Sequence, residues 1–439
     1  MDKKTTKKIS IIAAAVLAVA GAAGAIYYFT HRNTDELKKV PLAEIISESK
    51  IPDKEYDNLD LSNAVLNIPD AEKFYKLTVS EKGKYDAEEC TANAFELFDI
   101  LYPYVREENP DITFVGVNGD PLPAGEAEIS MMPSGEVDDA YIDCPTDDGN
   151  LYGVWFRPNG RFYCIDRNAS VAVTNGEPEL LIHLDRGEQA PDTKYLVDGE
   201  EYSPAQALEF AEKLISEKIV KYLACDKVSP TELAIIKTPD GENYAYMIQF
   251  EYVYENAPLF HLSLPLSQGN SFRMDEDNVL FVKMAAPDKI GSMYNMQGFS
   301  EITEDGEYKD NYIPLDTATD MLSEYLAPYY KNSIAEVTIK YSRKIPPTEY
   351  PEGKDDMSDY TDEEWTDMDN TNREIREKVP LRPYWCFIMD KKDPYSENFC
   401  LSGNAFFVDM QTGEIIIFDK TSQIYVSSEG SSLESEELI

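Results

Sequence analysis

The stretch Tyr244–Tyr254, which reads YAYMIQFEYVY, decides the fold class of this chain. Aromatic or aliphatic side chains occupy every second position from Tyr244 onward, and the polar residues Gln249 and Glu251 fall between them. Successive side chains of a β-strand point to opposite faces of a sheet, so this alternation predicts a long strand. Other segments carry apolar residues at helical spacing. We therefore expect an α+β protein.

Two segments carry the signature of a helix start. Asp86 is followed three residues later by Glu89, and Ser203 is followed in the same way by Gln206. This is the spacing of a capping box, in which the two side chains satisfy free backbone N–H groups at the helix start. Because Pro204 suits the first helical position, the second signal is the stronger one. A further helix is expected from about Asp316.

Short strand-like runs separated by turn residues surround these helices. Turns such as Asn118-Gly119 and Pro158-Asn159-Gly160 are typical of hairpins, so the sheets should be antiparallel and each should pack on a helix. The expected strands, besides the one at 244–254, are 111–117, 127–132, 140–144, 151–157, 161–166, 170–173, 180–184, 232–237, 259–266, 279–284, 337–341, 384–389, 404–409 and 414–418.

The order of the predicted elements suggests a modular ectodomain. A hairpin-rich α+β domain is expected at 61–194. A helix followed by about four strands then occurs twice, at 195–300 and 301–425, which predicts two modules of one kind. The second module contains an acidic insertion at 346–380. Ser and Glu dominate 426–439, where we expect a disordered acidic tail.

The N-terminal segment predicts a membrane anchor. Ile9–Phe29 carries no charge and, at about 1.5 Å per residue, can cross a hydrocarbon core of roughly 30 Å. The lysines within 1–8 favour a cytoplasmic location for that end. We therefore expect a single transmembrane helix at 9–29 and a stalk at 30–60, with the bulk of the chain outside. Ala23-Gly24-Ala25 leaves a cleaved signal peptide as the alternative, and both interpretations export the rest of the chain.

The charge of the chain restricts the classes of partner. The formal net charge is −42 at pH 7. Binding to nucleic acid depends on a basic surface, so a nucleic-acid partner is not expected. Adsorption to anionic lipid or to an anionic wall polymer is disfavoured for the same reason.

The six cysteines follow no zinc or redox motif. None of them forms a CxxC pair, so a zinc knuckle and a thioredoxin motif are both absent from the sequence. Cys144 with Cys164, and Cys386 with Cys400, are close in sequence. An oxidising compartment permits disulfides between them, and buried free thiols are the alternative.

Signatures of catalysis are scarce. His31, His183 and His261 are the only histidines, so a multi-histidine metal site or a Ser-His-Asp triad has little support, and His183 is expected to be a sheet histidine. The chain contains no P-loop, Gly-x-Ser-x-Gly or His-Glu-x-x-His motif. A glycosidase-like carboxylate pair cannot be located from sequence among 82 acidic residues.

The acidic insertion contains weak candidates for metal ligands. Asp367-x-Asp369, with Asp362 nearby, resembles part of a calcium-binding loop. The glycine and the glutamate that such a loop needs further on are missing. A solvated loop is therefore the expectation, with weak Ca²⁺ binding by Asp362, Asp367 and Asp369 as the alternative. No other cofactor is expected.

The last predicted hairpin carries a resemblance to known families. In Phe407–Ile416, FVDMQTGEII, Asp409 can accept hydrogen bonds from the turn amides, and Gly413 suits a left-handed conformation. With Arg382–Phe387, RPYWCF, it resembles the closing strands of PepSY-type modules, which have a cystatin-like order of helix and strands. The paired modules behind one span are similar to the YycH/YycI regulators of Gram-positive bacteria. That resemblance implies an extracytoplasmic protein without enzymatic activity that acts by contacting a sensor kinase.

The first folded region carries a second resemblance. Val65–Asp70, VLNIPD, and the helix after Asp86 look like uncharacterised exported, lipoprotein-like domains of Gram-positive gut bacteria. This resemblance implies a compartment and no chemistry.

These observations favour binding over catalysis. We expect a membrane-anchored extracytoplasmic protein that contacts a protein partner at the outer membrane face and regulates a sensor or an envelope protein. The alternatives are an extracytoplasmic protein that binds a ligand or a cation, and a wall-active hydrolase that uses a carboxylate pair.

Overall fold

The computed structural model describes residues 37–80, 83–132, 135–259, 280–295, 299–309, 311–326, 331–343, 361, 378–389, 405–419 and 424–427. In this part the protein is α+β, as the sequence predicts, with most strands in two sheets. No helix among these residues is long and apolar enough to cross a membrane, and the segment 9–29 lies outside them.

The chain forms two compact units. The central unit comprises Tyr75–Gly306 and Tyr341–Leu381, and the terminal unit comprises Met1–Phe74, Glu307–Lys340 and Arg382–Ile439. Each unit therefore gathers segments that are distant in the sequence.

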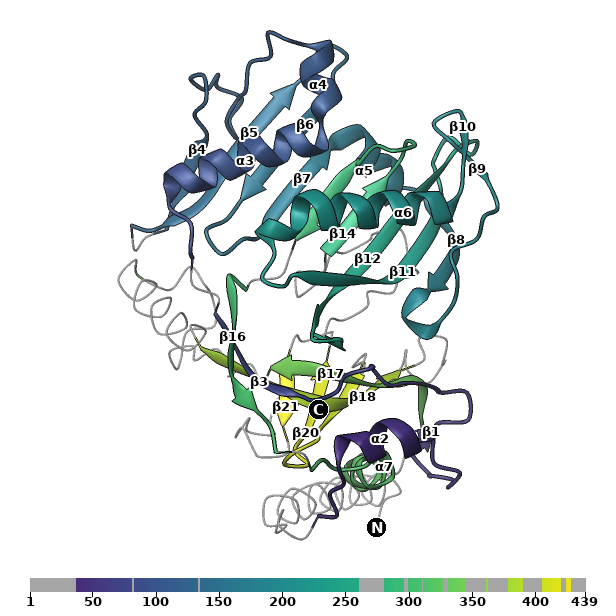
Figure 1. Cartoon of the computed structure of the whole chain (residues 1–439). Coiled ribbons are helices and arrows are strands. Elements are labelled where there is room, and N and C mark those ends of the chain that lie inside the picture. The colour runs from purple at the N-terminus through teal and green to yellow at the C-terminus, as the bar shows by residue number, and fades with distance from the viewer. Residues whose placement is uncertain are drawn as a thin grey trace, which may run out of the picture. The chain divides into compact units, whose positions relative to one another are not determined.

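A ten-stranded sheet runs through the central unit in the order β4-β5-β6-β7-β15-β14-β12-β11-β8, with β13 beside β12 (Figure 1). Strands from the regions 61–194 and 195–300 pair within it, and their pairing is antiparallel. The strands are β4 (Glu128–Met131), β5 (Val137–Pro145), β6 (Leu151–Phe156), β7 (Phe162–Asp166), β8 (Glu177–His183), β11 (Lys227–Lys237), β12 (Tyr244–Tyr254), β13 (Ala257–Pro258), β14 (Leu280–Met284) and β15 (Ser292–Asn295).

Helices α3 (Ala87–Leu101) and α6 (Pro204–Leu214) cover one face of this sheet (Figure 1). Tyr222, shortly after α6, packs its ring against Phe156 and Phe162, while its hydroxyl donates to Glu96 of α3. Burial of each large apolar side chain in this layer contributes roughly 1.5–3 kcal/mol. We call this the covered face of the sheet.

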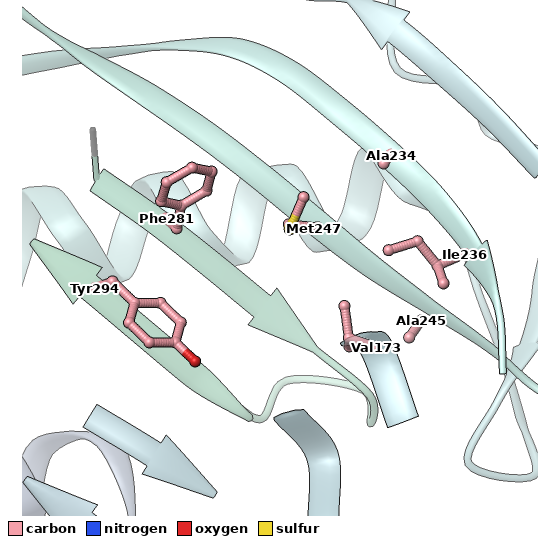
Figure 2. Packing of buried hydrophobic residues seen from close by; sticks show 7 residues of the cluster. All are labelled: Val173, Ala234, Ile236, Ala245, Met247, Phe281 and Tyr294. Atoms are coloured by element: carbon pink, nitrogen blue, oxygen red, sulfur yellow. The ribbon is translucent and has the colours of Figure 1, made fainter. Parts of the chain in front are cut away.

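The opposite face, which we call the α5 face, carries the helix α5 (Arg167–Thr174). Val173 of α5 packs with buried side chains of β11, β12, β14 and β15 (Figure 2). The cluster consists of Val173, Ala234, Ile236, Ala245, Met247, Phe281 and Tyr294. Because α5 is short, it covers only part of this face.

Both predicted capping boxes are confirmed. Asp86 accepts from the backbone N–H of Glu89 at 2.9 Å, and the Glu89 side chain accepts from the N–H of Asp86 at 3.0 Å. Ser203 and Gln206 repeat this exchange at the start of α6, with Pro204 at the first helical position. Local sequence thus sets where the two covering helices begin.

Two predicted strands are wrong. Residues 170–173 belong to the helix α5, because the Asp166 side chain accepts from the N–H of Ala169 and so caps a helix directly after β7. Residues 111–117 form no strand: Val115 makes only isolated bridges, with Asp143 and Pro121. The valines at these positions satisfy a strand-like pattern that tertiary context overrides.

The rest of the central unit consists of short elements. The α4 helix begins at Pro103, which ends α3 as predicted. Val379–Leu381 of β18 pairs with β3, which also pairs with β16. These elements are β3 (Tyr75–Ser80), α4 (Pro103–Glu108), β9 (Tyr195–Val197), β10 (Glu200–Tyr202) and β16 (Glu301–Glu307).

Strands of the terminal unit follow the order β1-β17-β18-β19-β20-β21, with β2 beside β17. The segment 30–60, predicted as a stalk, contains α2 in its described part, and Leu42 and Ile45 of that helix are buried. These elements are α2 (Leu42–Glu48), β1 (Leu59–Asp60), β2 (Val65–Asn67), α7 (Leu315–Tyr325), β17 (Asn332–Arg343), β18 (Val379–Met389), β19 (Ala405–Asp409), β20 (Ile415–Asp419) and β21 (Ile424–Ser427).

The turn between β19 and β20 has the predicted geometry. Asp409 Oδ1 accepts from the backbone N–H groups of Gln411 and Thr412 at 2.7 and 3.0 Å. Gly413 takes φ 77°, in the left-handed region. The other carboxylate oxygen of the fully buried Asp409 lies 3.1 Å from Arg382 Nη1, so a charge-assisted hydrogen bond joins the turn to β18.

Four cysteines of the central unit are buried free thiols, Cys144 and Cys164 among them. Burial raises the pKa of Cys144 to about 11 and that of Cys90 and Cys225 to about 12, and it also raises the pKa of Cys164. The pair Cys144 and Cys164 is therefore not a disulfide. Cys400 lies outside the described residues.

We predict that Cys90, Cys144, Cys164 and Cys225 of the full chain react very slowly with a thiol reagent at pH 8, because the thiolate is the reactive form. Unfolding in guanidinium should make all of them reactive. Peptide mapping by mass spectrometry after a short exposure distinguishes the sites. Rapid labelling of these cysteines in the native chain would contradict the packing described here.

Candidate functional site: a polar cavity at the end of strand β7

The central unit contains a cavity of about 350 Å³ at the end of β7. Its size falls within the range of roughly 300–1,000 Å³ that is usual for small-ligand sites. Small residues, including Ala169, Ala285 and Gly291, form part of its wall. The chemically active part of the lining comes from Tyr104, Tyr152, Asp166, Asp198, Asp240 and Lys289.

Asp166 places a carboxylate at the cavity wall. It ends β7 and caps α5, and its residue is only 9% exposed. Oδ1 accepts from Asn150 Nδ2 at 2.9 Å and from the Ala169 N–H at 3.1 Å. Oδ2 makes no hydrogen bond within the described residues. The fold therefore fixes the carboxylate with one oxygen and leaves the other as an acceptor.

Tyr104 of α4 and Tyr152 of β6 contribute two phenols. Their ring centroids are 6.0 Å apart in an edge-to-face arrangement. Burial raises the pKa of both hydroxyls, and the negative charge of Asp166 raises it further. Both phenols are therefore neutral at physiological pH and can donate or accept hydrogen bonds.

Lys289, in the turn between β14 and β15, contributes a positive charge. Its Nζ lies 4.8 Å from the centroid of the Tyr104 ring, a cation–π contact worth about 0.5–1 kcal/mol at a surface site. Among the residues that line the cavity in the described part of the chain, Lys289 is the one cation.

Asp240 and Asp198 add negative charge at the cavity wall. Asp240 accepts from Asn243 Nδ2, from the N–H groups of Asn243 and Glu242, and from the Thr238 hydroxyl. These hydrogen bonds, led by that from the Asn243 side chain, lower the pKa of Asp240, so it stays ionised. With three carboxylates and one ammonium, the lining favours a ligand that carries a positive charge.

The sequence-predicted metal ligands lie elsewhere. Asp362, Asp367 and Asp369 fall outside the described residues, so weak calcium binding there stays a prediction. Within the part of the chain that the structure describes, no group of three or more His, Cys, Asp or Glu side chains is placed to hold a metal ion.

His183 occupies a sheet position, in agreement with the expectation. It is the last residue of β8, and its Nδ1 lies 3.2 Å from Oε1 of Glu232, which is 1% exposed. The two residues are paired across β8 and β11. His31 and His261 lie outside the described residues.

Sequence reasoning missed the residues of the cavity. Tyr104, Tyr152, Asp166 and Lys289 come from α4, β6, β7 and the β14–β15 turn, and no motif spans them. One signal was available, because Asp166 lies three residues before Ala169 at the end of a predicted strand. An aspartate at that spacing is a helix cap, and it would have placed α5 correctly.

Comparisons with known proteins add no function. No family model matches this chain, and no curated protein does. A crystal structure of an uncharacterized protein from Eubacterium rectale ATCC 33656 covers 84% of this chain and 90% of its own, at 13% identity and a TM-score of 0.40. A similarity at that level carries no argument about fold or chemistry.

We predict that Asp166→Ala destabilises the central unit by about 1 kcal/mol more than Asp166→Asn. Asparagine caps helices about as well as aspartate, whereas alanine removes the acceptor for the Ala169 N–H. Urea unfolding of both full-length variants measures the difference. Equal stabilities would show that the cap of α5 contributes nothing.

Proposed function

We propose that this chain is an extracytoplasmic binding protein that captures a zwitterionic ligand of amino-acid size in the cavity at the end of β7. The observation that carries the proposal is the convergence of three carboxylates, two neutral phenols and one ammonium on about 350 Å³, with Asp166 Oδ2 as the acceptor that is left open. Asp166 Oδ2 would accept from the ammonium of the ligand, and Lys289 would bind its carboxylate.

The energies of these contacts suit reversible capture. A hydrogen bond to a charged group contributes about 1.5–3 kcal/mol, and here both ends of the ligand can form one. Asp166 is held in place by Asn150 and by the start of α5, so little conformational freedom is lost on binding. The lining offers recognition groups and lacks a histidine or cysteine in its described part, and this composition favours binding over a covalent reaction.

The side of the membrane on which the cavity lies depends on the N-terminal segment. We propose that Ile9–Phe29 anchors the chain in the cell membrane with its small N-terminal end inside and both units outside. The interpretation of 195–300 and 301–425 as PepSY-type modules belongs to the same proposal and rests on the order of elements in the sequence.

Contact with a protein partner at the outer membrane face stays a second proposal. It rests on the single span, the module order and the lack of catalytic motifs in the sequence. A ligand bound in the cavity could regulate such contact. Affinity purification from membranes that gave no reproducible partner would count against it.

We predict that isothermal titration of the full chain detects binding of L-serine or L-lysine and no binding of succinate. Asp166→Asn should lower the affinity at least tenfold, since tenfold corresponds to about 1.4 kcal/mol and a charge-assisted hydrogen bond is worth at least that. Lys289→Met should lower the affinity for both amino acids and leave the affinity for putrescine unchanged, because putrescine has no carboxylate.

The matched control is Asp53→Asn, which removes an exposed carboxylate of the terminal unit that pairs with Lys50 and does not line the cavity. It should leave every titration unchanged. Absence of binding for both amino acids, or equal affinities for the native chain and Asp166→Asn, would refute the proposed function.

A further inference from the structure

An aromatic row crosses three neighbouring strands on the α5 face of the ten-stranded sheet. We use this name for Tyr141 of β5, Trp155 of β6 and Tyr163 of β7. Tyr141 is paired with Trp155, and Trp155 with Tyr163, in the antiparallel registers of these strands. Their ring centroids are 5.5 and 5.6 Å apart. Cross-strand pairing thus places one ring per strand in a line.

Trp155 is exposed to solvent, whereas the residues before and after it on β6 are buried. Its residue is 44% exposed, whereas Val154 and Phe156 on the same strand are fully buried against the covered face. A tryptophan exposed to this extent on an inner strand presents apolar ring surface to solvent, and a ligand that covered this surface would gain free energy from its burial. The ring of Tyr163 packs on the buried Tyr294, and the two ring centroids are 4.4 Å apart.

Carboxylates flank the row. Asp139 and Asp143 stand two residues to either side of Tyr141, so all three share the α5 face. The Tyr141 hydroxyl donates to Asp143 Oδ2, which fixes the orientation of the ring. Gly153 leaves the space that this carboxylate needs, because a Cβ at 153 would overlap Asp143 Oδ1. Asp143 is only 8% exposed, so it orients the Tyr141 ring from within the protein, and the half-buried Asp139 is the more accessible of the two carboxylates.

This surface matches the chemistry of a sugar chain. A pyranose ring presents C–H groups on its faces, which pack on the negative faces of aromatic rings, and hydroxyls at its edge, which donate to carboxylates. The planes of neighbouring rings are inclined by 53° and 44°, so Trp155 offers the main stacking face and the half-buried Tyr141 and Tyr163 offer flanking contacts to the sugars on either side.

Arg157 lies near Asp139 and Arg167 near Asp143, so the charges that flank the row are mixed. The net charge of −42 of the whole chain disfavours acidic polymers. We propose that the aromatic row binds a glycan chain that carries no acidic groups.

A protein partner fits the surface less well. A stable protein interface buries about 800 Å² on each side around an apolar centre. Of the large apolar side chains exposed in the described residues, only Met131 and Trp155 belong to β4–β7. The apolar area therefore follows a narrow line, which suits an extended chain of sugars.

The test is a titration of the full chain with cellohexaose, xylohexaose and maltohexaose, followed by calorimetry, with a heparin hexasaccharide as the acidic probe. At least one neutral hexasaccharide should bind, and the heparin probe should not. Trp155→Ala should lower the affinity at least tenfold, and Trp155→Phe, which keeps a ring, should lower it less. Leu196→Ala, which truncates another exposed apolar residue on β9, should change nothing.

The proposal is overturned if no neutral hexasaccharide binds, or if Trp155→Ala binds as tightly as the native chain. Far-ultraviolet circular dichroism and urea unfolding of each variant establish that the fold is kept, and Trp155→Phe supplies the comparison if the alanine variant unfolds. Asp166→Asn should bind the hexasaccharide normally, so a failure of the row and a failure of the cavity are distinguishable.

Discussion

The central unit depends on the packing of α3 and α6 against one face of its ten-stranded sheet. Two capping boxes start these helices, and their apolar sides bury against side chains such as Phe156, Phe162 and Ile248. Once that face is covered, burial on it stabilises the sheet and the register of its strands. The α5 face buries an apolar cluster of its own around Val173, and it also carries the partly exposed rings of the aromatic row.

Helix α5 links the two functional surfaces that we propose. Its cap, Asp166, lines the cavity, and Ala169 and Ala172 on the helix line it as well. Ser170 on the same helix lies 3.3 Å from the hydroxyl of Tyr294, whose ring packs on Tyr163 of the aromatic row. The cavity and the row are therefore neighbours, separated by one helix and one buried tyrosine.

Local signals in the sequence were sufficient for much of the fold. The capping boxes at Asp86 and Ser203, the alternation from Tyr244 to Tyr254 and the turn at Asp409 each act over a few residues, and each is confirmed. The strand predicted at 170–173 failed for an equally local reason. The valines there favour a strand, while the cap at Asp166 starts a helix that buries Val173.

The candidate sites could not be predicted in the same way. Tyr104, Asp166 and Lys289 meet only because the antiparallel order of the sheet brings the ends of distant strands together. Part of the aromatic row could be predicted from the sequence. The turn at Pro158–Gly160 pairs Phe156 with Phe162, which sets Trp155 opposite Tyr163, but which face would stay open depended on where the helices pack.

Hydroxyl-radical footprinting of the full chain tests most directly whether α3 and α6 bury the covered face of the sheet while the aromatic row on the α5 face stays open to solvent. This arrangement predicts fast oxidation of Trp155, slower oxidation of the half-buried Tyr141, and strong protection of the buried residues Phe98, Phe156 and Tyr252. Protection of Trp155 at the level of these buried residues, or similar oxidation of aromatic residues on both faces, would contradict it.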